Sequence, residues 1–422
     1  MNPIAPPAFE KPRRDWSGLL LLLAALALLV PHISKLLVWA NNEGRFPIKP
    51  RDYNLVFAAL VGLLVLARRP KFSLLSFSFL IVPALRVLDA ALLKRFTMIG
   101  VIDDHTTFVM NLLSSLLISF CAMLCLADRR GYQIAQAVAA GVVLVVSAGI
   151  YDEWLGYHTM TSIPGRMAGF LEDPNAGPIA ICLMLGVLFT LNRRFWLNMT
   201  LVAVAAPAIA LTYSRSGMTI FAFLVLLYLA RNFWGHALAL SLLAGLGVPA
   251  VIAGVAMLQA STHQGVTRDT NVESRLQAIY ELDFSRLESQ ERGKDLEDGW
   301  EAVSHQPLLG YGTGAGSAHW QPHNEVVSIW LEIGIGGVLL YLGPLLLLSC
   351  QCLVHRGRGF YCLVPVWLFI PCSQTLLDMP VYWLAVATCC HVAVVQRIRF
   401  TLFPRRSRPA PRETAAHAPS SP

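Results

Sequence analysis

The sequence predicts an all-α polytopic membrane protein of about twelve transmembrane helices, with one large, partly helical loop between helices 9 and 10. Of its 422 residues, 55% are hydrophobic and 14% are charged, whereas about 25% of an average soluble domain is charged. The apolar residues fall into blocks close to the roughly 20 residues that a helix needs to cross a bilayer. Lys and Arg recur in alternate gaps between these blocks.

The predicted spans are separated by short connectors, apart from one long hydrophilic stretch. They cover residues 17–40, 53–67, 72–88, 106–126, 132–150, 176–191, 195–213, 217–230, 236–258, 325–353, 360–377 and 380–397. The first and the tenth are long enough to tilt or to extend past the bilayer. The first apolar stretch is too long for a cleavable signal peptide and lacks a small-residue cleavage site, so we expect it to remain as a span.

The positions of Lys and Arg predict the orientation, because short cytoplasmic loops are enriched in them. With the N-terminus inside, every second connector is short and basic. These connectors and the tail contain Arg68, Arg69, Lys71, Arg129, Arg130, Arg193, Arg194, Arg231, Arg356, Arg358 and Arg397 onward. The net charge of +7 is therefore a signal of topology. Because the basic residues are dispersed, we expect no nucleic-acid partner.

This alternation divides the chain into five parts. Residues 1–16 form a cytoplasmic N-terminus, 17–258 form transmembrane helices 1–9, 259–323 form the large outer loop, 324–398 form helices 10–12, and 399–422 form a cytoplasmic tail. The tail is rich in Pro, Arg, Ala and Ser, a composition that predicts disorder. The nine cysteines lie in or beside apolar spans, so the sequence predicts neither a disulfide framework nor a zinc site.

Two arginines lie at unusual positions relative to the predicted membrane. Arg215 occupies the very short turn between the seventh and eighth spans, and Arg86 lies late in the third span. Each could be an interfacial arginine that extends its guanidinium toward water. Each could equally bind an anionic lipid headgroup, because the planar guanidinium matches phosphate oxygens.

The large loop combines charged and glycine-rich segments. Its residues 273–305 have a mixed-charge pattern that predicts a helix with largely solvated faces. The glycine-rich stretch 307–316 follows no predicted strand, so a dinucleotide site is disfavoured. We expect this stretch to be a backbone-exposing turn over a phosphate or a sugar.

His323 stands where the large loop enters the tenth span, with Asn324 beside it. Glu332 follows on the predicted helix, and glycines at 334, 336 and 337 would allow close helix approach. A neutral imidazole at the mouth of a cavity is suited to take a proton from a hydroxyl group near pH 7.

Several motifs occur in an order that resembles the bacterial O-antigen ligase superfamily, over about residues 160–340. They are Arg166-x-x-Gly169 followed by Asp173-Pro-Asn175, the turn Ser214-Arg215-Ser216-Gly217, the segment HQPLLGYGTG, and His323-Asn324 with nine residues before Gly334-x-x-Gly337. The superfamily includes O-antigen ligases, related polysaccharide polymerases and O-linked oligosaccharyltransferases. Twelve spans with one periplasmic loop between spans nine and ten agree with this resemblance.

The resemblance implies a reaction on the periplasmic face of the bacterial inner membrane. The donor would be a glycan on undecaprenyl pyrophosphate, and transfer would require no metal or other cofactor. His323 would act on the acceptor hydroxyl, and Arg215 would hold the pyrophosphate. The second pyrophosphate-binding arginine would come from the loop. Family members place it one helical turn before an aromatic residue, and Arg292 precedes Trp300 by two turns, which leaves Arg275 as the alternative.

The remaining site residues would assist. Arg166 and Arg86 would make secondary contacts with the pyrophosphate, and Asn175 and Asn324 would be structural or would orient other groups. Chemistry supports an arginine cluster, because a departing pyrophosphate must be neutralised by a metal ion or by cationic side chains. The outer loops contain no convincing Asp-x-Asp motif, so we expect arginines to supply this charge.

The favoured activity is transfer of O-antigen to lipid A–core by a ligase. A polymerase that extends the same lipid-linked glycan is the alternative, since the two differ only in the acceptor. A protein O-oligosaccharyltransferase is less favoured, because those enzymes often have an additional C-terminal soluble region. A flippase or transporter is also less favoured, since such proteins place charged or broken helices near the bilayer midplane, whereas here the unusual residues gather on one face.

Overall fold

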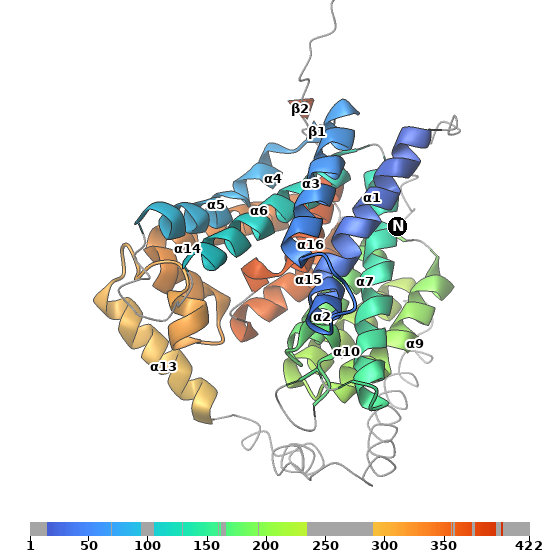
Figure 1. Cartoon of the computed structure of the whole chain (residues 1–422). Helices are drawn as coiled ribbons and strands as arrows, with labels where there is room; N and C mark the ends of the chain where they lie inside the picture. Colours follow the sequence, from blue (N-terminus) through green and yellow to red (C-terminus); the bar gives the residue numbers. More distant parts are fainter. Residues whose placement is uncertain are drawn as a thin grey trace, which may run out of the picture.

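The computed structural model describes residues 15–68, 70–93, 105–128, 130–158, 160–161, 166–192, 194–233, 290–355, 357, 359–373, 376–393 and 398–399 (Figure 1). The predicted ninth span, 236–258, lies outside these residues. So does the part of the predicted large loop that precedes residue 290. Every other predicted span coincides with a helix or with a short series of helices.

The regular secondary structure of the described residues is helical apart from one antiparallel pair of two-residue strands, β1 (Lys71–Phe72) and β2 (Ile398–Arg399). The helices of the first half are α1 (Trp16–Ile33), α2 (Leu36–Asn42), α3 (Pro50–Ala67), α4 (Leu74–Ser78), α5 (Ile81–Leu88) with the π-turn η1 (Asp89–Leu93), α6 (His105–Ala127) and α7 (Gly131–Trp154). They continue with η3 (Gly169–Leu171), α8 (Ala176–Leu191), α9 (Phe195–Leu211), α10 (Arg215–Phe233), α13 (Gln290–His305), η5 (Ala315–Trp320), α14 (Glu325–Val354), α15 (Phe360–Phe369), η6 (Ile370–Cys372), η7 (Leu376–Asp378) and α16 (Pro380–Ala393).

By length and composition, 6 helical stretches of the described chain could cross a membrane: α1, α3, α4–η1, α6, α7 and α14. Four shorter apolar helices accompany them, namely α8, α9, the stretch Phe360–Cys372, and α16. Together these helices make the chain a multi-pass membrane protein by composition.

α8 forms the centre of the bundle. Ile179 to Leu188 are buried without interruption, and a helix that is apolar all round is stable only when other helices or lipid surround it. α7, α9, α10, α15 and α16 all contact α8. α16 contributes the largest fully buried side chains, Trp383 and Tyr382. The core therefore joins the middle of the chain to its last described helix.

The predicted span 17–40 is divided into α1 and α2. Pro31 lies inside α1 and cannot donate to the carbonyl four residues earlier. The Tyr53 hydroxyl donates to that carbonyl, on Ala27, at 2.8 Å. α1 ends at Ser34, whose hydroxyl donates to the Val30 carbonyl at 2.8 Å, and Lys35 then adopts a left-handed φ of 53°. The change of direction follows from the proline and this cap.

The basic connectors of the first half meet on one face of the bundle. Arg68 pairs with Asp15 at 2.8 Å and with Asp128 at 2.7 Å. The strand after α3 pairs with the strand after α16, since Lys71 is opposite Arg399. Figure 1 shows β1 and β2 at the same end of the bundle as the start of α1. The start of α1, the α3–α4 connector, the α6–α7 connector and the chain after α16 therefore share a face.

α14 is broken at Gly334, which has φ 75° and ψ −171°. The glycine-rich segment 307–316 lies across this break. The amides of Tyr311 and Gly312 donate to the carbonyls of Leu331 and Glu332 at 2.6 and 3.0 Å. The sequence predicts that this segment exposes its backbone to a phosphate or a sugar. In the structure, the amides of Tyr311 and Gly312 instead hydrogen-bond to α14.

Gly334→Ala is expected to destabilise the protein, because its Cβ would lie 2.0 Å from the Leu308 carbonyl oxygen at a left-handed φ. Strain at such a position costs about 1–3 kcal/mol, before the displaced backbone is counted. Gly336→Ala is the matched control, since its Cβ meets nothing within 4 Å. Thermal unfolding of both variants in detergent measures the difference. Equal unfolding temperatures would contradict the role assigned to Gly334.

Candidate functional site

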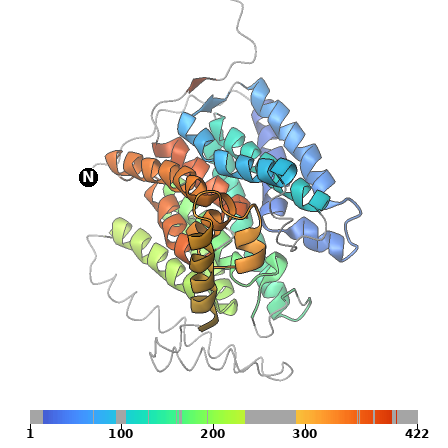
Figure 2. The same ribbon diagram turned by 90° about the vertical axis from the view of Figure 1, so that its left-hand side faces the viewer.

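α13 packs against the first half of α14 and brings charged residues to its N-terminal end. A Cβ on Gly299 would lie 3.1 Å from Pro322 and 3.3 Å from Val327, so the absence of a side chain permits the close approach. The Trp300 and Trp330 rings meet edge to face, with centroids 5.7 Å apart. Figure 2 shows α13, in dark gold, crossing the front of the bundle beside the orange start of α14.

His323 is held by the turn that begins α14. Its φ of 50° is left-handed, a conformation that non-glycine residues adopt at a cost. The Asn324 side chain caps the helix by accepting hydrogen bonds from the amides of Val326 and Val327 at 3.0 and 3.2 Å. Such a cap contributes about 1 kcal/mol to stability. Asn324 was predicted to orient other groups, and this cap fixes the backbone next to His323.

Three charged residues surround the His323 imidazole. Its Nε2 lies 3.9 Å from Asp295 Oδ2. Arg292 lies three residues earlier on α13, on the same helical face. Burial lowers the pKa of His323 below its ordinary 6.5, the Arg292 charge lowers it further, and Asp295 and Asp173 oppose that shift. The neutral imidazole is therefore favoured at pH 7, and neutral imidazole is the form that can accept a proton.

Arg215 begins α10 and is partly buried. Arg166, which is buried, supports the turn before it. The Arg166 Nε donates to the Thr212 carbonyl at 2.9 Å, and its Nη2 donates to Asn175 Oδ1 at 3.0 Å. The Ser214 hydroxyl donates to the same Asn175 oxygen at 3.1 Å. Arg166 and Asn175 thus fix the backbone that presents Arg215.

The segment 173–175 lies close both to His323 and to the turn before Arg215. Asp173 is close enough to His323 for its charge to act on the pKa of that residue. Asp173 Oδ1 also accepts a hydrogen bond from the Asn175 amide at 2.8 Å, and Asn175 contacts the turn before Arg215. The predicted base therefore lies next to the segment that positions the predicted pyrophosphate ligand.

A buried carboxylate that could not be predicted as a site residue binds the chain that precedes the segment 173–175. Glu153, at the end of α7, accepts four backbone hydrogen bonds. The donors are the amides of Met160, Thr161, Ala168 and Gly169, at 2.7 to 2.9 Å. The acidic side chain directly after a run of apolar helix was the available signal, but its partners are visible only in three dimensions.

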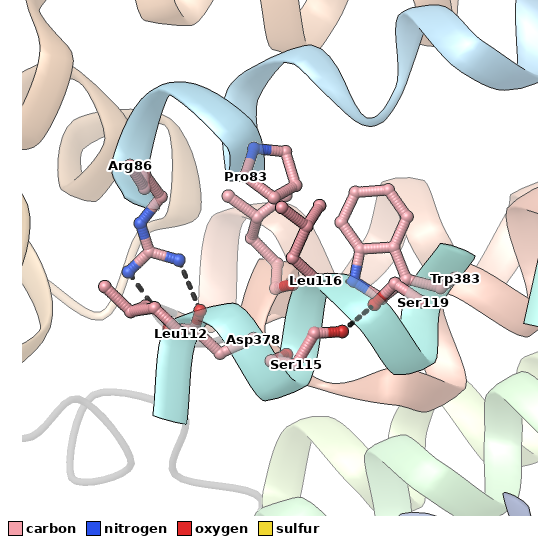
Figure 3. Close-up of a pocket in the computed structure, with 9 residues that line it drawn as sticks. Pro83, Arg86, Leu112, Ser115, Leu116, Ser119, Asp378 and Trp383 are labelled. Atoms are coloured by element: carbon pink, nitrogen blue, oxygen red, sulfur yellow. Dashed lines mark hydrogen bonds and ion pairs between the residues drawn. The ribbon is translucent and has the colours of Figure 1, made fainter. Parts of the chain in front are cut away.

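Arg86 lies in a different environment from Arg215. It is buried in α5, and its Nε donates to Glu332 Oε2 at 2.7 Å. Its terminal nitrogens also pair with Asp378 on η7. Figure 3 shows Arg86 and Asp378 facing each other at one end of a small pocket that also includes Ser115, Ser119 and Trp383. The guanidinium of Arg86 is thus bonded to protein carboxylates.

Arg275 lies outside the described residues. Among the residues that the structure does describe, no group of three or more His, Cys, Asp or Glu side chains is arranged to hold a metal ion.

Residues 199–342 match the family described as O-antigen ligase. The matched range includes Arg215, Arg275, Arg292, His323 and Gly334. It confirms the resemblance to the O-antigen ligase superfamily and supports a membrane glycosyltransferase of the ligase and polymerase type. No curated protein matches the chain.

Proposed function

We propose, on the premise that residues 199–342 are the O-antigen ligase domain of a membrane glycosyltransferase, that this protein transfers O-antigen from undecaprenyl pyrophosphate to lipid A–core. The observation that carries the proposal is the environment of His323. Its imidazole lies near Arg292, Asp295 and Asp173, and the segment 173–175 contacts the turn before Arg215.

The proposed reaction is a single displacement at the anomeric carbon of the glycan. The acceptor oxygen forms a bond to that carbon, while the bond from the carbon to the pyrophosphate oxygen breaks. His323 accepts the proton of the acceptor hydroxyl. The electron pair of the broken bond stays on the pyrophosphate, where Arg215 and Arg292 stabilise the developing negative charge. Asp295 orients the imidazole during this proton transfer.

The arginines divide into two groups in this proposal. Arg215 and Arg292 bind the pyrophosphate, because each lies beside the segments that surround His323. Arg166 and Arg86 are assigned to positioning, because Arg166 bonds to Thr212 and Asn175 and Arg86 bonds to two carboxylates. Arg275 remains the predicted alternative to Arg292, and no metal or other cofactor takes part.

The basic face of the bundle indicates the orientation. Arg68, Lys71, Arg130 and Arg399 lie in connectors that share this face, and basic connectors favour the cytoplasmic side. We therefore place the protein in the bacterial inner membrane with about twelve spans. His323 and the large loop then face the periplasm, where the lipid-linked glycan and lipid A–core would meet.

Deletion of the gene tests the assignment. A ligase predicts that full-length glycan accumulates on undecaprenyl pyrophosphate while the lipid A–core stays bare. A polymerase, the alternative that uses the same donor, predicts core that carries a single repeat. Electrophoresis of lipopolysaccharide and mass analysis of the lipid-linked pool distinguish the two outcomes. Long O-chains on the core of the deletion strain would rule out both activities for this protein.

The pH dependence of transfer follows from the direction of the His323 shift. Because the pKa of His323 is lowered below 6.5 in the folded protein, the imidazole stays neutral and active somewhat below that pH. We expect the rate of transfer by the purified protein to fall as the pH is lowered and the imidazole becomes protonated, with a midpoint below pH 6.5. An acidic limb centred well above pH 6.5 would contradict the assignment of His323 as the base.

A further inference from the structure

We propose that Arg86, Glu332 and Asp378 form a clasp that positions His323, so that they act as positioning residues for the transfer reaction. The proposal rests on the proposed function of His323 as the base. It concerns three residues that touch neither His323 nor the segment beside Arg215 in any contact described above. Their effect on His323 follows from the elements that they join.

The clasp joins three elements that are distant in sequence. Arg86 comes from α5, Glu332 from the first half of α14, and Asp378 from η7. The guanidinium contacts both carboxylates, with Arg86 Nε 2.7 Å from Glu332 Oε2 and its terminal nitrogens on Asp378. Arg86 and Glu332 are 6% and 2% exposed. A planar guanidinium that bridges two carboxylates fixes distance and direction together.

A second link runs from η7 to Glu325, which lies close to His323 in the sequence. Glu325, the first residue of α14, is buried. Its two carboxylate oxygens accept hydrogen bonds from the amides of Leu376 and Leu377, both at 2.8 Å. Asp378 is the next residue along the chain. The clasp therefore holds the turn that holds Glu325, and Glu325 lies two residues after His323.

A third link connects α5 to the glycine-rich segment between α13 and α14. The Asp89 carboxylate accepts a hydrogen bond from the Thr313 amide at 2.7 Å and lies 2.9 Å from the Thr313 hydroxyl. Asp89 follows Arg86 by one helical turn. The α5–η1 stretch thus contacts Glu332 near the end of the half-helix and also contacts the glycine-rich segment that hydrogen-bonds to Glu332.

The break in α14 explains why such positioning is needed. Gly334 interrupts the helix two residues after Glu332. The half-helix from Glu325 to Glu332 is therefore not aligned by continuous α-helical geometry with the longer half that follows. Its orientation depends on contacts with other elements, which are the backbone hydrogen bonds from Tyr311 and Gly312 and the side-chain contacts of the clasp at Glu332. Without them the imidazole would move relative to Arg292, Asp295 and Asp173, the charged residues that face it.

The test compares Glu332→Gln and Asp378→Asn with Asp128→Asn in the full-length protein, purified with a lipid-linked glycan donor and lipid A–core acceptor. Asp128 pairs with Arg68 at 2.7 Å and is 1% exposed, so its variant also breaks a buried ion pair, but among the basic connectors and not at the clasp. We expect both clasp variants to lower kcat about tenfold or more, since small misplacements of reacting groups have large effects. KM for the donor should change less than about twofold.

The pH profile separates positioning from stability. In the clasp variants, the acidic limb of the rate profile should move toward pH 6.5 as His323 leaves its surroundings, whereas Asp128→Asn should leave the limb in place. Asp378→Glu, which keeps a carboxylate, should restore part of kcat. If a variant does not fold, Arg86→Lys serves instead, because it keeps the positive charge without the planar guanidinium.

Two outcomes would contradict these proposals in different ways. An unmoved acidic limb, with a loss of kcat equal to that of Asp128→Asn, would overturn the clasp and leave the proposed function standing. Full activity of His323→Ala would instead reject the proposed function.

Discussion

His323→Ala is expected to lower the rate of glycan transfer by about 10²–10⁴-fold, the range that a positioned general base contributes. The imidazole is kept neutral by burial and by the neighbouring Arg292. Removing it leaves the acceptor hydroxyl without a proton acceptor. Donor binding should change little, because the proposed pyrophosphate contacts come from arginines. The measurement is the initial rate of transfer by purified protein at saturating donor and acceptor.

His305→Ala is the matched control for this variant. His305 ends α13, is exposed, and contacts the Glu301 carbonyl of its own helix at 2.8 Å. It is also a histidine, and it lies on α13, the helix whose Asp295 contacts His323. It is assigned no part in the reaction. We expect its rate to equal that of the unaltered protein. A rate for His323→Ala within about twofold of the control would reject the assignment of His323 as the base.

Arg292→Ala is expected to have the second largest effect, a loss in kcat of about 10²–10³-fold, comparable to the removal of one preorganised donor that stabilises developing charge. The same change removes the positive charge that helps to lower the pKa of His323. The pKa of His323 should therefore rise, and the acidic limb of the rate profile should move to higher pH. Arg292→Lys should recover only part of the rate, because an ammonium group cannot replace the planar guanidinium.

Lys294→Ala provides the control for this second variant. Lys294 lies on the same helix two residues away and is exposed. Residues two apart on a helix do not share a face, so its charge points away from His323. Loss of activity in Lys294→Ala equal to that in Arg292→Ala would mean that the net charge of α13, and not one guanidinium, supports transfer. The role proposed for Arg292 would then fail.

Most helices could be predicted from apolar blocks, because burial in lipid or in a bundle requires long apolar runs. The breaks were harder to predict. In the predicted span 360–377, the helical stretch ends at Cys372, after Pro371. The amides of Leu376 and Leu377 in η7 donate to Glu325. The span 72–88 is divided into α4 and α5–η1. Such breaks depend on partners elsewhere in the chain.

The candidate site could be predicted only in part, because the partners of its side chains come from elsewhere in the chain. His323 and Arg215 are predicted from their positions, because a charged or titratable residue at a membrane boundary is unusual. Arg292 is predicted only through the family resemblance, from its spacing to Trp300. Glu332 and Asp378 could not be assigned as partners of Arg86, because carboxylates on apolar helices give no sign of which cation they meet. The partners of Glu153 could not be predicted either, since its four donors are backbone amides of a later segment.

The reach of the Arg86 contacts has a consequence for biosynthesis. Arg86 meets Glu332 across 246 residues and Asp378 across 292. Because a chain is synthesised from its N-terminus, these contacts form only after η7 has left the ribosome. Contacts between distant positions also form slowly, and incomplete chains fold by parts. A nascent chain that already carries His323 and both proposed arginines is therefore expected to be inactive until its last helices insert.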